Sequence, residues 1–391
     1  MAAHFAALAG DDVLVIEKNE KIGKKIYITG KGRCNLTNAC DPDEFLRNVV
    51  TNARFLTSSV SAFPPSFIMS FFEENGLELK VERGNRVFPA SDKSSDVIKT
   101  LAKILERDGV RIRFNETVLK IVAENGVVKR VVTDKGEYSA DKVIVATGGR
   151  SYAQTGSTGD GYVFARETGH TVTATRPALV PMLTEEGFSS LAGLTLKNVS
   201  LNVFYDGKKI SGEFGELLFT HAGVSGPIVL TTSSRINSLE SGRLKLFVDL
   251  KPALDERTLD DRVLRDFKKF SKKQLKNALG DLLPASLVPH VIASSGVSGE
   301  KRVDDVNKEE RGRLVSTLKA FPLSFRALAD YNEAIVTSGG VSVKEIDPKT
   351  MQSKLVSGLY FAGEVMDVDA LTGGFNLQIA WATGAKAGSR A

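Results

Sequence analysis

The stretch from Val13 to Asn38, VLVIEKNEKIGKKIYITGKGRCNLTN, decides the fold. It opens on a short apolar run, VLVI, which is typical of a strand buried on both faces of a parallel sheet. The strand ends at Glu17, and an acidic residue at this point of a dinucleotide-binding unit typically binds the ribose hydroxyls of adenosine. The basic, glycine-rich residues that follow suit a loop beside a diphosphate, because glycine lets backbone amides approach anionic oxygens.

The residues before this stretch resemble the second half of a βαβ unit. Met1 to Gly10 is Ala-rich and predicts a helix, which ends at Gly10 just before the VLVI strand. In a dinucleotide fingerprint, the acidic residue lies about 20 residues beyond the glycine turn. That spacing from Glu17 would put the last fingerprint glycine just ahead of Met1. We therefore infer that the first strand and the G-x-G-x-x-G turn were lost upstream of this sequence.

Length and composition indicate an ordinary globular protein of two or three domains. The chain has 391 residues, a net charge of +5 and two cysteines. The charge excess is small, so no nucleic-acid partner is expected. No apolar run is long enough for a membrane span, and the N-terminus lacks the features of a signal peptide. Few cysteines fit a reducing compartment, so we expect a cytoplasmic protein.

Downstream, helical and strand patterns alternate. Two helical patterns fill Asp41 to Asn75, short strands are expected over Leu77 to Pro89, and an amphipathic helix over Ser94 to Gly109. Further strands lead to Asp141–Gly149, DKVIVATGG, which reads as another buried strand that ends in a glycine doublet. This alternation is typical of an α/β fold.

The pattern changes from about Pro177. Leu196 to Ile210 alternates around Asp206-Gly207, which predicts a β-hairpin. Leu254 to about Phe321 is mostly charged and predicts helices. From Val356 the sequence VSGLYFAGEVMDVDALTGGFNLQIAWATGAKAG again predicts a strand, a glycine turn and a helix.

Four motifs are weak singly but informative in combination. They are ITGKGRCNLTN, TGSTGDGY, FTHAGVSGP and GEVMDVDALTGGFNLQIAWATG, in this order. Together they resemble the family of FAD-dependent flavoproteins that includes aminoacetone oxidases and bacterial 3-dehydro-bile-acid reductases, within the two-dinucleotide-binding flavoproteins. The resemblance covers nearly the whole chain. Its one departure is the upstream strand and glycine turn.

The resemblance implies an α/β architecture of three parts. A Rossmann-like FAD-binding domain is expected from residues 1–180 and 335–391. A β-rich, barrel-like substrate domain is expected from residues 181–253 and 322–334, and a helical subdomain from residues 254–321.

The resemblance also implies FAD-binding positions along the chain. The adenosine end is matched by Glu17, Lys18, Val118, Thr147 and Gly148. The loop beside the pyrophosphate, ribityl chain and flavin is matched by Lys25, Gly30, Gly32, Arg33, Cys34 and Asn35. Gly363 and Glu364 match the turn at the ribityl chain, and Gly374, Phe375, Asn376 and Leu377 match a helix N-terminus at the flavin. A helix N-terminus there would stabilise negative charge on the reduced flavin.

His221 is the one candidate catalytic residue, because FTHAGVSGP belongs to the motif set and could face the flavin. A hydrogen-bonded structural histidine is the alternative reading. Cys34 and Cys40 have five residues between them, which differs from the C-x4-C of flavin disulfide reductases, so two reduced thiols are expected. The four histidines are scattered, and no metal site is expected.

These features predict an FAD-dependent oxidoreductase that transfers a hydride between flavin N5 and a small organic substrate. One version is an NAD(P)H-driven reduction of an unsaturated or oxo compound, with the nicotinamide bound transiently. The alternatives are an amine or aminoketone oxidase that uses O2, a truncated non-catalytic remnant or binding protein unable to hold FAD, and an RNA-modifying flavoenzyme.

Overall fold

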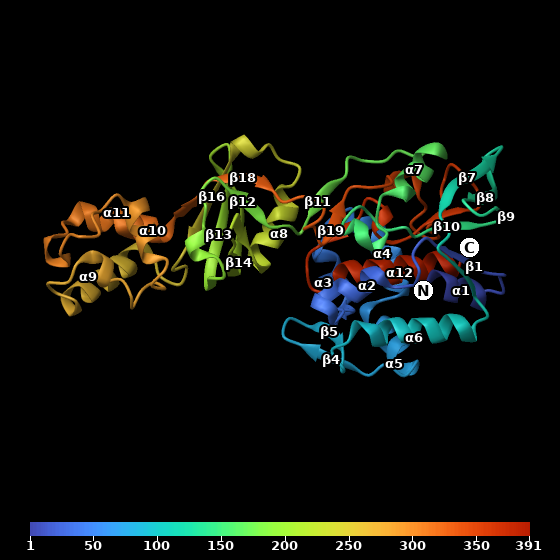
Figure 1. Ribbon diagram of the computed structural model, residues 1–391, viewed down its shortest axis with the longest axis horizontal. Coiled ribbons are helices and arrows are strands. Elements are labelled where there is room, and N and C mark those ends of the chain that lie inside the picture. The colour runs from blue at the N-terminus through green and yellow to red at the C-terminus, as the bar shows by residue number, and fades with distance from the viewer. The chain divides into compact units, whose positions relative to one another are not determined.

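The computed structural model describes residues 1–391 as two compact units (Figure 1). Unit 1 comprises Met1–Ala178 and Asp330–Ala391, and unit 2 comprises Leu179–Ala329. Unit 1 contains the parallel strands and every predicted cofactor residue. Unit 2 contains one large antiparallel sheet and several helices.

The parallel strands of unit 1 form two separate pairs. β1 (Leu14–Glu17) pairs with β6 (Arg111–Phe114), and β10 (Val143–Val145) pairs with β20 (Leu359–Phe361). All four residues of β1 are only half-buried. The prediction that this strand is buried on both faces is therefore wrong, and β1 is also hydrogen-bonded along only one edge.

Helices with small residues pack closely in unit 1. α1 (Ala2–Leu8) and α12 (Phe375–Gly388) lie against each other, and a Cβ on Gly388 would come within 2.1 Å of the Ala2 carbonyl oxygen. Two further helices belong to this unit. α2 (Lys24–Ile28) follows β1, and α6 (Ser94–Arg107) follows the short strands at Leu79–Glu82 and Arg86–Pro89. α2 lies within residues expected to be a loop, so that expectation was incomplete.

The region from Asp41 to Asn75 corrects another expectation. In place of two helices it forms α3 (Pro42–Arg47), the short strand β3 (Val49–Thr51), α4 (Ala53–Ala62) and α5 (Pro65–Glu74). β3 interrupts the helical pattern because its backbone pairs with β21 (Asp369–Ala370), which lies far away in sequence. No single helix is long and apolar enough to cross a membrane, and only the bent pair α4 and α5 meets that test of length and composition.

The remaining strands of unit 1 form small sheets. One sheet has the order β2-β5-β4, another is the antiparallel meander β7-β8-β9, and a third is the pair β11-β19. Their bounds, with that of α7, are β2 Thr37–Asn38, β4 Leu79–Glu82, β5 Arg86–Pro89, β7 Val118–Glu124, β8 Val127–Thr133, β9 Glu137–Ser139, β11 Arg176–Ala178, β19 Val336–Ser338 and α7 Asp160–Glu167.

Unit 2 is built on a seven-stranded sheet with the order β17-β16-β13-β14-β15-β12-β18. The strands are β12 Met182–Thr184, β13 Thr195–Tyr205, β14 Lys208–Phe219, β15 Gly223–Ser225, β16 Leu244–Asp249, β17 Phe321–Leu323 and β18 Phe325–Leu328. The predicted hairpin is confirmed as β13 and β14. Its turn residues Asp206 and Gly207 have φ of 50° and 77°, the left-handed values that a tight hairpin turn requires.

The helices of unit 2 share one apolar core with this sheet. They are α8 (Pro227–Ile236), α9 (Glu256–Lys269), α10 (Val288–Ser295) and α11 (Lys308–Lys319). Buried side chains of the sheet, such as Leu201, belong to the same cluster as buried helical side chains, such as Val263. Burial of apolar area in one continuous cluster is the main stabilising contribution of such a unit.

Candidate cofactor site

The loop that follows α2 lies against the amino end of α12. With its amide oriented to satisfy its neighbours, the Asn35 side chain accepts a hydrogen bond from the Gly374 N–H at 3.0 Å and donates to the Thr37 carbonyl oxygen at 3.1 Å. A Cβ on Gly374 would lie 2.3 Å from that same oxygen. Only glycine therefore allows this approach, which brings two predicted site residues, Asn35 and Gly374, into contact.

Two side chains of α12 hold this loop in place. The buried Trp381 Nε1 donates to the Leu36 carbonyl oxygen at 2.9 Å. Gln378, also buried, accepts from the Thr37 hydroxyl at 2.7 Å and donates to the Phe63 carbonyl oxygen at 2.8 Å. Buried polar groups need such partners. Neither Gln378 nor Trp381 was predicted as a site residue, because their partners lie more than 300 positions away.

The loop itself has an unusual backbone. Gly30, Lys31 and Gly32 have φ of 57°, 58° and 84°, and Cys34 has a φ of 60°. A Cβ on Gly30 would lie 2.8 Å from the Asn35 nitrogen, whereas one on Gly32 would meet no atom within 4 Å. Alternating left- and right-handed residues, as at Gly32, Arg33 (φ −94°) and Cys34, turn backbone N–H groups toward one side and can form an anion-binding nest. The open side at Gly32 leaves room for a ligand beside the backbone.

Lys25 joins three separate chain segments. Its Nζ donates to the carbonyl oxygen and the hydroxyl of Ser151 at 2.9 and 2.7 Å, and lies 3.9 Å from Glu364 Oε2. Glu364 Oε1 in turn accepts from the Ser151 hydroxyl at 3.0 Å and from the Thr337 N–H at 2.8 Å. Burial lowers the pKa of Lys25, and the charge of Glu364 partly opposes this effect. The predicted residues Lys25 and Glu364 thus lie close together. Ser151 and Thr337, which were not predicted, hydrogen-bond to them.

The acidic residue at the end of β1 remains partly available. Glu17 Oε1 accepts from the backbone and side-chain nitrogens of Asn19, both at 2.8 Å. Lys18 lies beside it but turns toward α7, where its Nζ is 2.6 Å from Asp160 Oδ2. Glu17 is therefore the better placed of the two for the ribose hydroxyls.

One unpaired buried hydroxyl group lies in the turn after β10, and a second lies on α7. Thr147 Oγ1 is buried without a hydrogen-bond partner, and a Cβ on Gly161 would come within 2.2 Å of it. The Tyr162 hydroxyl, on α7, is likewise buried and unpaired, and burial raises the pKa of this phenol. Gly148 has a φ of 72°, and a Cβ there would lie 3.0 Å from Ser157 Oγ. Val118 begins β7 and is half-buried.

Several predicted residues use their side chains to hold the fold. Arg33 pairs with Glu82 and with Asp92, and its guanidinium lies 4.1 Å from the centre of the Phe88 ring. Phe375 is buried with its ring centre 5.6 Å from that of Phe45. Such side chains leave only their backbone for a ligand.

The residues next to Phe375 behave in the same way. The Asn376 side chain accepts a hydrogen bond from the Ala370 N–H at 2.9 Å and donates one to the Ala370 carbonyl oxygen at 2.8 Å. Leu377 packs against the apolar cluster of α5 and α6. Gly363 donates its N–H to the Thr383 hydroxyl at 3.0 Å, which fixes the turn after β20 on α12. The amino end of α12 is thus rigidly held.

Both cysteines are free and buried. Burial raises the pKa of the Cys34 thiol to about 11, and the Cys40 thiol also has a pKa of about 11. These thiols stay protonated near neutral pH, so neither is an activated nucleophile. His221 is exposed in unit 2, in the turn between β14 and β15. Its catalytic role stays a prediction.

The residues of unit 1 fit an extended dinucleotide such as FAD. An acid ends β1, unpaired buried hydroxyls lie by the turn after β10, and the left-handed loop is open at Gly32. Asn35 joins this loop to the start of α12, a 14-residue helix whose amino end carries partial positive charge. No group of histidine, cysteine or acidic residues could hold a metal ion.

Comparisons with known proteins identify the family. A family model described as the HI0933-like protein Rossmann domain matches residues 1–390. The chain is 32% identical to the 3-dehydro-bile acid delta(4,6)-reductase of Clostridium scindens, over 100% of this chain and 96% of that protein. It is 31% identical to the ribosomal RNA dihydrouridine synthase of Haemophilus influenzae, over 98% of this chain and 92% of that protein.

A solved structure shares the fold. The 3-ketosteroid delta1-dehydrogenase of Sterolibacterium denitrificans has a TM-score of 0.51 and 13% identity, over 99% of this chain and 96% of that one. At this identity the likeness concerns the fold alone. The predictions of a Rossmann-like α/β fold, of the family and of FAD as its cofactor are confirmed by the matches taken together.

Proposed function

The chain belongs to the HI0933-like Rossmann family, and on this premise we propose that it reduces a carbon–carbon double bond conjugated to a carbonyl group. The names of two relatives support this reaction class. One names the reduction of double bonds at positions 4 and 6 of a 3-oxo bile acid, and the other names the formation of dihydrouridine from a uracil ring. Each of these reductions adds two hydrogens across one such bond.

The observation that carries the proposal is the contact between the left-handed loop and α12. Bound FAD would supply the ring that accepts and donates a hydride. Backbone groups of Gly30 to Asn35 would hold its flavin end, Lys25 its phosphates, and Glu17 its ribose. The amino end of α12 would stabilise negative charge on the ring or on a substrate carbonyl oxygen.

A small unsaturated oxo compound is the favoured substrate class. The purified protein would be reconstituted with FAD and mixed anaerobically with NADH or NADPH, and loss of the oxidised-flavin absorbance would be followed. A 3-oxo-4-ene steroid would then be added, and we expect a product heavier by two hydrogen atoms. A protein that binds FAD but is reduced by neither nucleotide would rule out the NAD(P)H-driven version.

The other readings predict different results in the same experiment. An oxidase would instead be reduced by an aminoketone and would consume O2. A non-catalytic remnant would stay colourless after addition of FAD. These outcomes separate failure of the cofactor assignment from failure of the substrate assignment.

A uracil base in RNA is the second candidate substrate, because a relative named as an RNA dihydrouridine synthase is nearly as similar as the bile-acid reductase. Against it, several basic side chains on the helices of unit 2 are paired with acids. Arg262 pairs with Asp266 at 2.9 Å, and Arg311 with Asp260 at 2.6 Å. If the protein reduces a ribosomal RNA transcript and does not reduce the steroid, the uracil base becomes the favoured substrate.

The role of Lys25 gives a direct test of the cofactor site. Lys25→Met should weaken FAD binding by about tenfold or more, which corresponds to about 1.4 kcal/mol. The matched control is Lys21→Met. That side chain is 69% exposed, and its one ion pair, with Glu20, is long at 4.0 Å. Since burial lowers the pKa of Lys25, its charge is lost at a lower pH than that of an ordinary lysine. FAD affinity of the unsubstituted protein should therefore fall on the alkaline side, and titration calorimetry across pH would measure both effects.

A further inference from the structure

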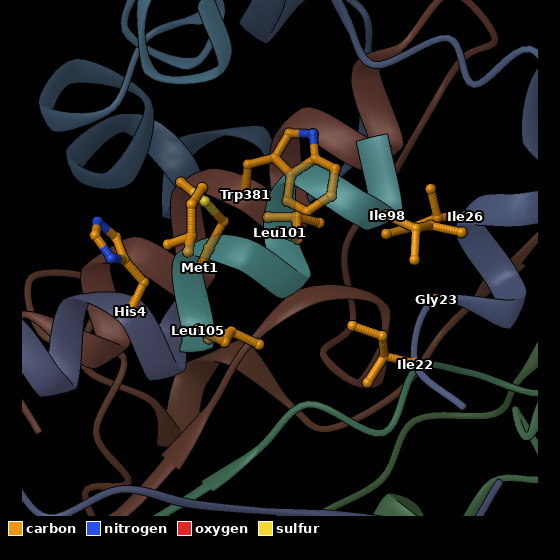
Figure 2. A pocket seen from close by; sticks show the side chains of 10 residues that line it. Met1, His4, Ile22, Gly23, Ile26, Ile98, Leu101, Leu105 and Trp381 are labelled. Carbon is orange, nitrogen blue, oxygen red and sulfur yellow. The ribbon is translucent and has the colours of Figure 1, made fainter. Parts of the chain in front are cut away.

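The apolar cavity of unit 1 offers no free polar side chain to orient a ligand. It has a volume of about 220 Å³ and is lined by residues of α1, α2, α6 and α12 (Figure 2). His4 Nδ1, at its edge, lies 2.5 Å from Asp108 Oδ2, and Trp381 Nε1 donates to the Leu36 carbonyl oxygen. Away from the cofactor residues, free polar side chains lie together with exposed aromatic rings on the sheet of unit 2.

This sheet buries one face and exposes the other. Along β13 and β16, Leu201, Val203, Leu246 and Val248 belong to the apolar core. Successive residues of a strand point to opposite faces of the sheet. The residues between them therefore lie on the outer face, and β14 follows the same alternation at Phe214, which is 65% exposed.

The strand register arranges the outer residues in three rows across β16, β13 and β14, which are neighbours in the sheet (Figure 1). From the first row to the third, the residues that lie opposite one another are Lys245, Phe204 and Lys209; Phe247, Asn202 and Gly212; and Asp249, Ser200 and Phe214. Each row thus contains one aromatic ring, and the first row places its ring between two lysines.

The two lysines of the first row carry charge that no acid of the protein pairs with. Lys209 extends over Gly212, where a Cβ would lie 3.2 Å from the Lys209 Nζ. Both lysines are exposed and form no ion pair, in contrast to Arg262 and Arg311 on the helices. This end of the face therefore attracts anionic groups.

The other polar side chains of the face are paired, distant or uncharged. Asp249 pairs with Lys319 at 2.7 Å, and the exposed Glu216 lies beyond Phe214, at the end away from the lysines. Asn202 and Ser200 are half-buried and make no hydrogen bond through their side chains. Their amide and hydroxyl groups are free to bind a ligand on the sheet.

The aromatic rings provide two places where a flat group can stack. The ring centres of Phe204 and Phe247 are 5.7 Å apart and their planes meet at 82°, so this pair presents one ring face and one ring edge. Phe214 offers a second ring, and the four residues between the first and third rows span about 13 Å. Two flat groups can therefore bind at separate positions along the sheet.

We propose that this face binds single-stranded RNA, with bases stacked on Phe214 and on the Phe204–Phe247 pair and phosphates beside Lys209 and Lys245. Exposed aromatic rings on an open sheet stack unpaired bases, and basic side chains beside them bind the phosphates. The ribose 2′-hydroxyl, which DNA lacks, both donates and accepts hydrogen bonds and so suits the free Asn202 amide. The net charge of the whole chain gave no reason to expect nucleic acid, whereas the local arrangement does. Binding here requires no flavin, so the inference does not depend on the proposed reaction.

Fluorescence anisotropy with a labelled RNA tests the proposal. The full chain, without added FAD or reductant, is titrated into a single-stranded RNA of about 12 nucleotides. Phe214→Ala should weaken binding by at least about fivefold, because one stacked base is lost. Phe214→Tyr keeps the ring and should bind as the unsubstituted chain does, whereas Phe214→Leu keeps only apolar bulk and should behave like Phe214→Ala. A DNA strand of the same sequence should bind at least about threefold more weakly.

The salt dependence of binding tests the lysines separately. Lys209→Gln together with Lys245→Gln should reduce the slope of log affinity against log salt concentration by about 0.7 for each lysine. The matched control is Lys268→Gln together with Lys272→Gln, which removes two exposed charges from the same unit and should leave the slope unchanged.

Four results would overturn the proposal. They are no binding of the RNA, equal affinity for the DNA strand, Phe214→Leu that binds as well as Phe214→Tyr, and Phe214→Ala that converts a dimer into a monomer. The last result would assign the face to a second copy of the chain, and size-exclusion chromatography would detect it. Circular dichroism melting of each variant separates loss of this surface from loss of the fold.

Discussion

The two units of this protein are stabilised in different ways. The strands of unit 2 form a single seven-stranded antiparallel sheet, and one apolar cluster joins that sheet to the helices. The strands of unit 1 are divided among six sheets of two or three strands, and its apolar residues form two clusters. In unit 2, backbone hydrogen bonds between neighbouring strands connect all seven strands of the sheet. Unit 1 depends on contacts between helices and loops that are distant in sequence.

Polar side chains make many of these distant contacts in unit 1. Trp381 and Gln378 bind the loop at Leu36 and Thr37, and Asn38 Nδ2 donates to the Gly373 carbonyl oxygen at 3.0 Å. The same segments are the ones that would hold the cofactor. The less continuous unit is thus the one that contains the predicted cofactor residues.

The largest expected effect would separate the two units. Phe219, on β14, is fully buried with its ring centre 4.9 Å from that of Phe188. Phe219→Ala should destabilise unit 2 by about 3–5 kcal/mol through lost burial and a cavity. Trp381 lies in unit 1, so its fluorescence transition should not move while the far-UV circular dichroism of unit 2 melts earlier.

The matched control for this substitution lies on the same strand. Phe214 is 65% exposed, and Phe214→Ala should change neither transition by more than about 0.5 kcal/mol. If Phe219→Ala shifts the tryptophan signal and the circular dichroism together, the units unfold as one and the comparison fails.

A smaller effect is expected in unit 1 from one lost polar contact. Gln378→Ala leaves the Thr37 hydroxyl and the Phe63 carbonyl oxygen without their partners. A buried unsatisfied group costs about 1–3 kcal/mol, so the Trp381 transition should move down while that of unit 2 stays. Lys386→Ala, on the same helix but half-buried, is the control. Bound FAD should recover part of the loss, which differential scanning calorimetry with and without FAD would show.

The next effect depends on pH. Asp369 is fully buried, one of its oxygens is unpaired, and burial raises the pKa of its carboxyl. The folded state then holds the proton more tightly than the unfolded state, whose aspartates ionise near pH 4. Unit 1 therefore loses stability as pH rises above that value. Asp369→Asn should raise the Trp381 melting midpoint at pH 8 more than at pH 5, whereas the exposed Asp141→Asn should shift both alike.

The smallest effect concerns reactivity and leaves stability unchanged. With a thiol pKa of about 11, roughly one Cys34 in a thousand is ionised at pH 8. Iodoacetamide should therefore label Cys34 only when unit 1 opens, and peptide mass spectrometry would give the rate. Phe219→Ala should not increase that rate, whereas Gln378→Ala should. Rapid labelling of native protein at pH 8 would contradict the burial of this loop.

Local chemistry made part of the fold predictable. The hairpin at Asp206 and Gly207 was correct because the turn type depends on those two residues. The helix predicted over Ser94 to Gly109 was found as α6, because apolar spacing determines its buried face. β3 was missed because its partner, β21, lies more than 300 residues away.

The candidate site shows the same limit. Glycines and the loop composition indicated which segments would meet a cofactor. The residues that join these segments could not be found this way, since Ser151, Thr337 and Gln378 have no local pattern of their own. Side chains such as Arg33 and Phe375 matched the motifs, yet they pack within the protein. A motif position therefore does not reveal whether the side chain or only the backbone is free.

The chain leaves unit 1 after Ala178 and returns at Asp330, and paired strands mark both crossings. In unit 1, β11 pairs with β19, and in unit 2, β12 pairs with β18. The two ends of the inserted unit are therefore adjacent, which is the arrangement that tolerates domain insertion. Because its two ends lie side by side, a change in the length of residues 179–329 leaves the strand pair β11 and β19 of unit 1 intact.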